Sequence, residues 1–431
     1  MSKNKIGIIG IGKLGLPLAL SFLNSKVEVK VYDIDESRIN TIKNKSFKTD
    51  EAGVPDLLEK YGSKLDFADS VKELVEFSNT IIILVNTQIN ETYSSENVIT
   101  VVSEIVSELN NNEKYEIVIS STVMPGDINN KIKPILNSSR APIDIFYIPD
   151  FVKLGSVIYD FENPDFLIVG SESSSSSLNK VLDIYRLLIK NDAPIKNLTI
   201  SEAELAKLAF NTFYLTKLSF VNMLSNICNE LPDTNVDAIT NAIGPDPRIN
   251  NGNKFFKGGT AFGGTCLHRD INAFIQFTSS VNINPGLVVE AERINSYQNQ
   301  LLYQYISEIS EGNKTVGIYG VTFKPGTDVI THSASLEVIK LLLENNSEVK
   351  VFDESDIAVD EVKALYGEQV SYSKSANEFI DDSDIIVIMH MGQKLNKENI
   401  ELLKNKILID PWRNLEFNND YELIQLGYSR K

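Results

Sequence analysis

The sequence predicts two doubly wound, Rossmann-like α/β domains that flank an all-helical middle domain. Three observations carry this prediction: a glycine-rich turn between two strand-like runs near the N-terminus, a long stretch of helical spacing from Ser201, and a repeat of the first pattern after residue 314. A chain of 431 residues is long enough for two or three domains. We place the domains at residues 1–200, 201–300 and 301–431.

The composition is that of a globular protein with an excess of acidic residues. Apolar residues make up 42% of the chain and charged residues 23%, which is enough to bury large cores. The net charge of −17 argues against nucleic acid or an anionic membrane as a partner. Two cysteines cannot form a disulfide framework, three isolated histidines provide no zinc site, and no apolar run reaches the ~20 residues of a membrane span. We therefore expect a cytoplasmic protein without a metal.

The first 35 residues follow the order strand, glycine turn, helix, strand and acid. Lys5–Ile9 is predicted to be a buried strand, Leu16–Leu23 a helix and Val27–Tyr32 a second strand. The turn Gly10-Ile11-Gly12-Lys13-Leu14-Gly15 lets a pyrophosphate approach the helix N-terminus. Asp33 ends the second strand. At this position a carboxylate accepts hydrogen bonds from the ribose hydroxyls and repels a 2′-phosphate. The pattern predicts NAD as the cofactor rather than NADP.

Further apolar runs extend the first sheet at 80–85, 117–121, 143–148 and 166–169. Such runs are typical of parallel strands that are covered on both faces. The first two end in small polar residues, and ligands of doubly wound sheets bind at the carboxyl ends of the strands. Thr87 and Thr122 are therefore candidate ligand contacts, with ordinary turn chemistry as the alternative. The serine run Ser173–Ser177 is expected to be an exposed loop.

From Ser201 the pattern becomes helical. Ser201 and Glu204 have the spacing of a capping box, and helical spacing continues to Glu230. The third part repeats the first, with strands at 314–320 and 348–353, a helix at 336–344 between them, and later strands at 384–389 and 407–410. Two such α/β parts, one on each side of the helical part in sequence, predict two nucleotide-binding domains.

The stretch from Gly258 to Cys266 carries the clearest signal for catalysis. Its four glycines predict a loop whose N–H groups can approach a ligand, and Thr265 is a plausible N-cap that places Cys266 in a first helical turn. A helix N-terminus lowers the pKa of a thiol and so favours the nucleophilic thiolate. Asp270 follows one turn later as a candidate acid or base. Cys228, in an apolar helical stretch, is expected to be a core residue.

Lys207 and Asn211 are one helical turn apart on the long predicted helix. An ammonium and an amide side by side can stabilise an oxyanion or hold a water molecule. Taken alone, the pair would be read as an exposed helix face. The cysteine after the glycine-rich loop is the reason to link the two features.

Together these residues resemble the UDP-glucose/GDP-mannose dehydrogenase family over nearly the whole chain. The resemblance rests on five motifs in the family's order, Gly10-x-Gly12-x-x-Gly15, Ser121 to Gly126, Ala206 to Asn211, Phe262 to Asp270 and Phe323 to Asp328. It implies oxidation of the C6 hydroxyl of a nucleotide sugar to a carboxylate by two NAD. The expected reaction is UDP-glucose to UDP-glucuronate, a precursor of cell-surface polysaccharide. Cys266 would form a thiohemiacetal and then a thioester, which water hydrolyses.

The resemblance also implies roles for single residues. Lys207 and Asn211 would stabilise the C6 oxyanion, Asp270 and Thr122 would activate a water, and Asp150 stands where the family has a glutamate proposed as a base. The implied cofactor contacts are Gly10, Gly12, Lys13, Leu14, Gly15, Asp33, Arg38, Thr87, Thr122 and Arg269. The implied substrate contacts are Phe151, Lys153, Lys207, Asn211, Arg248, Phe256, Gly263 and Lys324. Arg248 would reach the neighbouring subunit of a homodimer, whose interface would be the long helix.

Two departures from the family pattern leave other functions open. Leu154 and Thr331 stand where the family has a glutamate and an arginine, so a divergent paralogue that binds nucleotide sugar or NAD with little turnover is one alternative. A two-electron dehydrogenase of the hydroxyacid class is another, although it would not need Cys266. Asp246–Ile249 resembles UDP-glucose enzymes, whereas Ala261–Leu267 resembles GDP-mannose enzymes. UDP-N-acetylhexosamines remain a third class of substrate.

Overall fold

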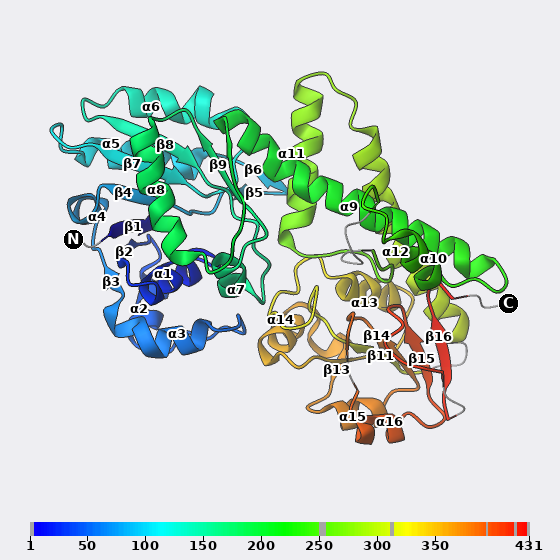
Figure 1. Cartoon of the computed structure of the whole chain (residues 1–431). Helices are drawn as coiled ribbons and strands as arrows, with labels where there is room; N and C mark the ends of the chain where they lie inside the picture. The colour runs from blue at the N-terminus through cyan, green and yellow to red at the C-terminus, as the bar shows by residue number, and fades with distance from the viewer. Residues whose placement is uncertain (1–3, 250–255, 311–313, 394, 418–419, 429–431) are drawn as a thin grey trace. The chain divides into compact units, whose positions relative to one another are not determined.

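A computed structural model describes residues 4–249, 256–310, 314–393, 395–417 and 420–428, without the side chains of Cys266 and Lys397. The chain divides into two compact units, Met1–Phe210 and Asn211–Lys431 (Figure 1). The division into 1–200, 201–300 and 301–431 stays a prediction. Within the described ranges, no helix combines the length and the apolar character that a membrane span requires.

The first unit is built on an eight-stranded sheet. Its strand order is β10-β9-β8-β7-β4-β1-β2-β3, and neighbours pair in parallel except for β8 with β9. The strands are β1 Lys5–Ile9, β2 Glu28–Tyr32, β3 Asp66–Phe67, β4 Thr80–Ile83, β7 Tyr115–Ile119, β8 Ile143–Tyr147, β9 Leu167–Ser171 and β10 Ile195–Leu198, with a separate hairpin of β5 Gln88–Ile89 and β6 Thr92–Tyr93. The helices are α1 Gly15–Asn24, α2 Glu36–Lys43, α3 Val54–Tyr61, η1 Gly62–Lys64, α4 Val71–Phe77, α5 Glu96–Glu108, η2 Ile128–Ile132, α6 Lys133–Asn137, α7 Val157–Glu162 and α8 Ser175–Leu188.

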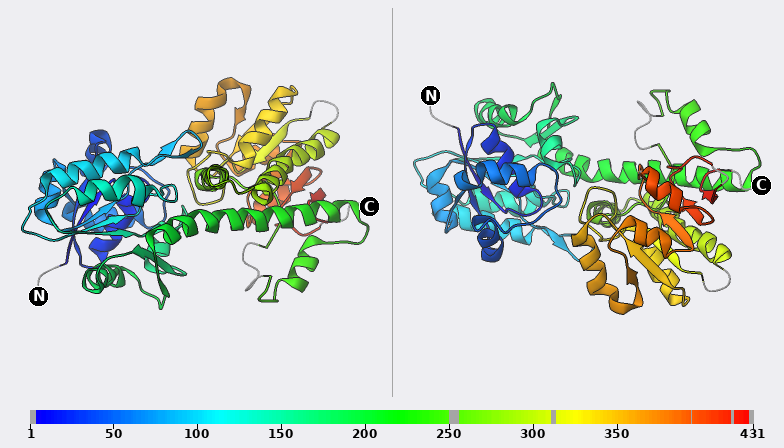
Figure 2. Two further views of the ribbon diagram at one scale, coloured as in Figure 1. Left: turned by 90° about the horizontal axis from the view of Figure 1, so that it is seen from above. Right: turned by 90° about the horizontal axis from the view of Figure 1, so that it is seen from below.

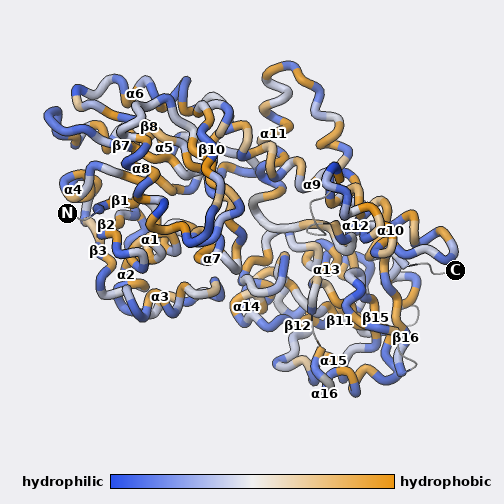
Figure 3. Tube along the Cα trace, viewed as in Figure 1, coloured by the Kyte–Doolittle hydropathy of each residue, from blue (hydrophilic) through white to orange (hydrophobic). Residues whose placement is uncertain are grey.

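Helices cover both faces of this sheet. One core cluster joins α1, α7 and α8 to the sheet through residues such as Phe22, Phe146 and Tyr185. The other joins α4 and α5 to the opposite face through residues such as Leu74 and Val102. Strands β4 and β7 are buried along their whole length, which explains why each contains three consecutive apolar residues rather than an alternating pattern. Figure 3 colours the chain by hydropathy.

The second unit contains a six-stranded parallel sheet and a group of helices. The strand order is β13-β12-β11-β14-β15-β16. The strands are β11 Val316–Tyr319, β12 Val349–Phe352, β13 Ser371–Tyr372, β14 Ile385–Ile388, β15 Ile407–Asp410 and β16 Glu422–Gln425. The helices are α10 Val236–Ile243, α11 Thr265–Ser280, α12 Gly286–Ile309, α13 Ala334–Glu344, α14 Asp356–Tyr366, η3 Gly367–Gln369, α15 Ala376–Asp381 and α16 Lys397–Leu402. Helix α9, Ile200–Glu230, begins in the first unit and ends in the second, and Figure 2 shows it as one uninterrupted helix.

The order of elements confirms the predicted fold class, with two α/β sheets and a helical stretch between them in sequence. The start of α9 differs from the prediction, because Thr199 and Glu202 form the capping box. The Thr199 N–H donates to Glu202 Oε2 at 2.8 Å, and the Glu202 N–H donates to Thr199 Oγ1 at 3.3 Å. Glu204, which was expected to serve the cap, is fully buried instead.

The serine run was also predicted incorrectly in part. Helix α8 begins at Ser175, and Ser177 is buried in its first turn. Serine is unfavourable inside a helix but common where a helix begins, so a serine run can start a helix as well as form a loop. Cys228 is fully buried among apolar side chains, which confirms its predicted core position.

One buried arginine ties the C-terminal sheet to the helices of the second unit. The side chain of Arg413, which follows β15, is 5% exposed. Its guanidinium donates to both carboxylate oxygens of Asp237 on α10, at 2.7 and 2.9 Å. It also donates to the carbonyl oxygens of Gly258 at 2.8 Å and Leu426 at 2.5 Å. The guanidinium of Arg413 therefore joins the segments of Asp237, Gly258 and Leu426.

We expect Arg413→Met to destabilise the second unit by about 2–4 kcal/mol, because it leaves Asp237 and two carbonyl oxygens without their charged donor. Denaturant unfolding measures the loss. Arg293→Met is the control, since the guanidinium of Arg293 is 71% exposed and pairs with Glu290 on the same helix. That change should cost less than about 0.5 kcal/mol. Equal losses in the two variants would contradict the inferred role of Arg413.

Candidate active site

The glycine turn after β1 leaves space beside its middle glycine. A Cβ on Gly10 would lie 2.3 Å from the carbonyl oxygen of Leu84, and a Cβ on Gly15 would lie 1.9 Å from the carbonyl oxygen of Gly10. At Gly12 the nearest atom would be Nη1 of Arg38, 3.9 Å away. The outer glycines therefore permit close packing, whereas the open middle position next to the start of α1 fits a pyrophosphate. The other residues of the turn are Ile11, Lys13 and Leu14.

Asp33 is held beside this turn at the end of β2. Its Oδ2 accepts from the N–H of Ile11 at 2.7 Å, and its Oδ1 accepts from the N–H of Asp35 at 2.9 Å. Nη1 of Arg38 lies 3.8 Å from Oδ2. The backbone thus fixes a carboxylate at the position that contacts a ribose in dinucleotide-binding folds.

Thr87 and Thr122 come together at the carboxyl ends of the neighbouring strands β4 and β7. The Thr87 hydroxyl donates to the carbonyl oxygen of Thr122 at 2.7 Å. The N–H of Val85 donates to the hydroxyl oxygen of Ser121 at 2.8 Å, and that hydroxyl donates back to the carbonyl oxygen of Val85 at 2.9 Å. These bonds tie the two loops into one polar edge of the sheet.

The first turns of α9 bring Lys207 to the loop after β8. Its Nζ donates to the backbone carbonyl oxygen of Asp150 at 2.6 Å and lies 4.9 Å from the ring centroid of Phe151. The Phe151 ring packs edge-on against Phe166 and Phe210, with centroid distances of 4.9 and 5.1 Å. The ammonium is therefore fixed on one side by a carbonyl and on the other by an aromatic wall.

The carboxyl group of Asp150 is buried. Its Oδ2 is inaccessible to solvent and has no hydrogen-bond partner among the described residues. Burial raises the pKa of Asp150 to about 7, although the positive charge of Lys207 opposes the rise. A carboxyl group with such a pKa can exchange a proton near neutral pH, as a general base must.

Carboxylates hold the loop that follows Asp150. The Lys153 N–H donates to Asp160 at 2.8 Å, and the Lys153 ammonium lies 3.2 Å from the same carboxylate. Glu51 accepts from the N–H groups of Gly155 and Val157 at 2.6 and 2.8 Å. This role of Glu51 was not predicted, because nothing in the local sequence links it to a loop 104 residues away.

In the second unit, Asn211 and Asp270 are in direct contact. The Asn211 amide donates to Oδ2 of Asp270, which is fully buried, and the bond joins α9 to α11. Cys266 is the second residue of α11, one turn before Asp270, and its side chain lies outside the described part of the structure. The helix begins at Thr265 with Gly264 in the N-cap position, so the prediction of Thr265 as the cap was wrong.

Amide side chains hold the backbone of the glycine-rich loop before α11. The N–H groups of Gly259 and Phe262 donate to Asn222 and Asn295 at 2.8 and 2.7 Å. Gln298 donates to the carbonyl oxygen of Gly259 at 2.7 Å. The loop was predicted to offer its N–H groups to a ligand, and for these two groups the structure corrects that prediction, because buried side chains already bind them.

The glycines of this loop allow close packing. A Cβ on Gly263 would lie 2.1 Å from the carbonyl oxygen of His332, and a Cβ on Gly264 would lie 2.8 Å from the ring of Phe323. No larger residue fits at either position without movement of its neighbours. The predicted substrate contact at Gly263 is thus also a packing contact within the second unit.

The remaining predicted residues belong to the second unit. The side chain of Arg248 is 87% exposed and pairs with Asp246. Phe256 is buried in an apolar cluster, Lys324 lies with its Nζ 5.7 Å from the ring centroid of Phe323, and Arg269 is half-buried on α11. The predicted contacts of these residues with substrate or cofactor stay predictions.

Three parts of the chain match models of one family, described as the UDP-glucose/GDP-mannose dehydrogenase family. The NAD-binding domain model matches residues 4–189, the central domain model residues 201–297 and the UDP-binding domain model residues 317–416. Together these matches extend over most of the chain.

Single relatives agree with the family match. The chain is 28% identical over 416 residues to the UDP-glucose 6-dehydrogenase TuaD of Bacillus subtilis (strain 168), covering 94% of this chain and 88% of that protein. A UDP-glucose dehydrogenase structure from Pyrobaculum islandicum has a TM-score of 0.86 at 25% identity, covering 97% of both chains. A UDP-D-ManNAc dehydrogenase structure from Pyrococcus horikoshii has a TM-score of 0.80 at 22% identity, covering 98% of this chain and 99% of that one, and shows the shared fold.

We expect Asp150→Asn to stabilise the protein at pH 8 by about 1–3 kcal/mol and by clearly less at pH 5. The raised pKa of Asp150 means that the folded state holds its proton more tightly than the unfolded state, so the wild type loses stability as pH rises from about 4 to 7. The asparagine cannot ionise and removes this loss. Thermal unfolding at both pH values measures the difference. The exposed carboxylate Asp192 provides the control, since Asp192→Asn should show no such pH-dependent gain.

Proposed function

The chain belongs to the UDP-glucose/GDP-mannose dehydrogenase family, and we propose that it oxidises the C6 hydroxyl of UDP-glucose to the carboxylate of UDP-glucuronate. The observation that best supports the proposal lies on α9. Lys207 is bound to the loop of Asp150, and Asn211, one turn further along the same helix, is bound to Asp270. A cation, an amide and two carboxyl groups are the functional groups that alcohol oxidation and thioester hydrolysis require.

The NAD-binding domain model of the family matches residues 4–189, and NAD would accept the hydride when it is bound there. In our proposal the turn around Gly12 holds the pyrophosphate and Asp33 accepts from the adenosine ribose. Asp150 takes the proton of the C6 hydroxyl, because its raised pKa suits proton acceptance near neutral pH. Lys207 and Asn211 donate to the C6 oxygen while negative charge develops on it.

We assign the covalent steps to the first turns of α11. The thiolate of Cys266 adds to the C6 aldehyde, so that a C–S bond forms and the carbonyl oxygen takes up a proton. The thiohemiacetal becomes a thioester when its C6 hydride leaves to a second molecule of NAD and its hydroxyl proton leaves to a nearby base. A water that Asp270 and Thr122 hold attacks the thioester carbon, the C–S bond breaks, and the thiolate leaves with the electron pair. The sugar loses four electrons in total and gains one oxygen from water.

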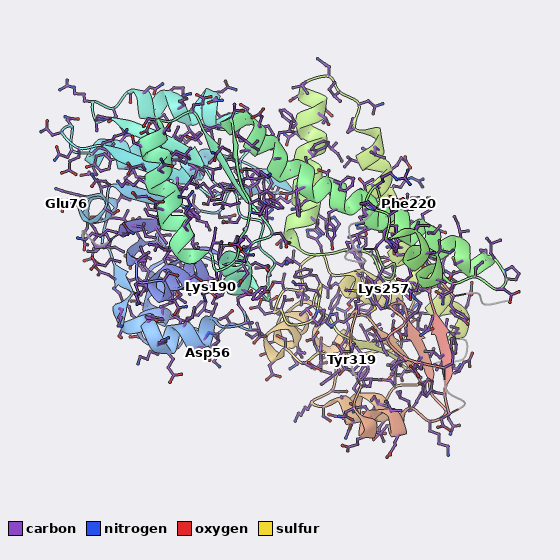
Figure 4. The ribbon with its side chains drawn as sticks, viewed as in Figure 1. Asp56, Glu76, Lys190, Phe220, Lys257 and Tyr319 are labelled. Atoms are coloured by element: carbon purple, nitrogen blue, oxygen red, sulfur yellow. The ribbon has the colours of Figure 1, made fainter. Side chains whose placement is uncertain are left out.

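We further propose that the working unit is a homodimer built on α9. Three apolar side chains at intervals of seven residues, Phe213, Phe220 and Ile227, are 72%, 46% and 45% exposed. Figure 4 labels Phe220 on α9. Seven residues correspond to about two helical turns, so these side chains lie on one face of α9. A single self-complementary face of this kind suits an interface with two-fold symmetry.

A cytoplasmic location is part of the proposal. Two cysteines in 431 residues fit a reducing compartment, where disulfides do not form.

The stoichiometry of the reaction tests the proposed function. We expect two NADH per UDP-glucose consumed, and Cys266→Ser should abolish this turnover, because a hydroxyl is a far weaker nucleophile than a thiolate at neutral pH. Cys228→Ala is the matched control, since Cys228 is a core residue, and it should keep the ratio of two. NADH formation is followed by absorbance and sugar consumption by chromatography.

The same assay separates the alternatives. A ratio of one would indicate a two-electron dehydrogenase, and no NADH would indicate a protein that only binds its ligands. Parallel assays with a UDP-N-acetylhexosamine and with GDP-mannose test the nucleotide and the sugar, and a higher kcat/KM for either would replace UDP-glucose as the substrate.

If the chain forms the proposed dimer, a variant that disrupts the α9 face should have half the mass of the wild type in solution. The wild type should have twice the chain mass of 48.1 kDa in light scattering, whereas Phe220→Glu should be monomeric because it places a charge in the apolar face. Leu365→Glu, at a 60% exposed position on α14, is the control and should remain a dimer. A monomeric wild type with full activity would end the dimer proposal.

A further inference from the structure

The carboxylate of Glu204 is completely buried against the loop that follows β7. Its Oε2 accepts from the N–H of Gly126 at 2.7 Å, and its Oε1 accepts from the N–H of Ile128 at 3.0 Å. Gly126 has a φ of 92°, a backbone conformation that glycine adopts at little cost. Two charge-assisted hydrogen bonds therefore fasten this end of the loop to α9.

The opposite end of the same loop is fastened to the loop after β4. Thr87 donates to the carbonyl oxygen of Thr122, and Ser121 exchanges hydrogen bonds with the backbone of Val85. Thr122 therefore lies between two anchors. Because Lys207 follows Glu204 by one helical turn, the anchor on α9 fixes the loop relative to Lys207 as well.

We propose that Glu204 is a positioning residue for the nucleotide-sugar oxidation, whose carboxylate keeps Thr122 at a fixed place relative to Lys207. The inference rests on the proposed function, in which Thr122 holds a water and Lys207 stabilises the oxyanion. Glu204 acts through this loop and touches no reacting atom. A displacement of about 1 Å in a catalytic group can lower a rate about 100-fold, so loss of the anchor should affect kcat.

The anchor depends on pH, because only the ionised carboxylate accepts both bonds freely. Burial, the largest cause, raises the pKa of Glu204 to about 7, the two N–H groups lower it, and the negative charge of Asp127 raises it further. Asp127 precedes η2 and is paired with Lys131 at 2.7 Å, while Lys207 is the nearby cation on α9. Protonation turns one acceptor oxygen into an O–H donor. The loop should therefore be held above about pH 7 and released below it.

Glu204→Gln tests the proposal with two measurements. Its amide NH₂ would face a backbone N–H, so at pH 8 we expect kcat to fall by about tenfold or more while the Kd for NAD changes by less than about twofold. Hydrogen exchange of Gly126 and Ile128 should be faster in the variant. In the wild type, protection of these two amides, corrected for intrinsic rates, should weaken from pH 8 to pH 6, and in the variant it should not depend on pH.

Glu202→Gln is the matched control, because it removes the same charge from the same turn of α9 at an exposed position. It should keep kcat within about twofold and leave the loop protected. Unchanged kcat and exchange in Glu204→Gln, or equal losses in both variants, would overturn the proposal. If the wild type oxidised no nucleotide sugar, the proposed function would fail, and the exchange measurement would still decide whether Glu204 holds the loop.

Discussion

The hydrogen bonds from the first turns of α9 to the loops after β7 and β8 are the interactions on which the candidate site of the first unit depends. Glu204 is fully buried and Lys207 is half-buried, and placing ionisable groups away from water is costly unless their partners are fixed. Both bind backbone groups, N–H groups in one case and a carbonyl in the other. A backbone partner cannot rotate away as a side chain can, so the two loops and the helix hold a single arrangement.

Much of the fold could be predicted because it follows from local patterns. Strands β1, β4 and β7 are rich in consecutive apolar residues, since helices cover both faces of the sheet, and a glycine turn marks the boundary between β1 and α1. The capping box was misplaced by two residues because Thr199 and Ser201 are equally good caps, and both have a glutamate three residues later. Tertiary contacts decided between them, since Glu204 is needed elsewhere.

The site was less predictable, because its properties come from contacts between distant segments. The residue types at Lys207, Asn211 and Asp270 indicated chemistry, but no local pattern shows that an amide of α9 binds a carboxylate of α11. The pKa of Asp150 depends on the burial of its carboxyl group, which is known only after folding. The amide side chains that hold the glycine-rich loop were missed for the same reason, since asparagine and glutamine inside helices carry no local signal of their partners.

The contact between Arg413 and the glycine-rich loop has a consequence for biosynthesis. Arg413 binds the carbonyl oxygen of Gly258 across 155 residues of sequence, and the adjacent Trp412 packs against Gly259. The segment before Cys266 is translated long before Trp412 and Arg413. Its contacts with these two residues can therefore form only after the second sheet has been translated through β15. Until translation has passed residue 413, side chains of earlier helices, Asn222, Asn295 and Gln298, can bind the backbone of this loop, but the contact from Arg413 to Gly258 cannot form.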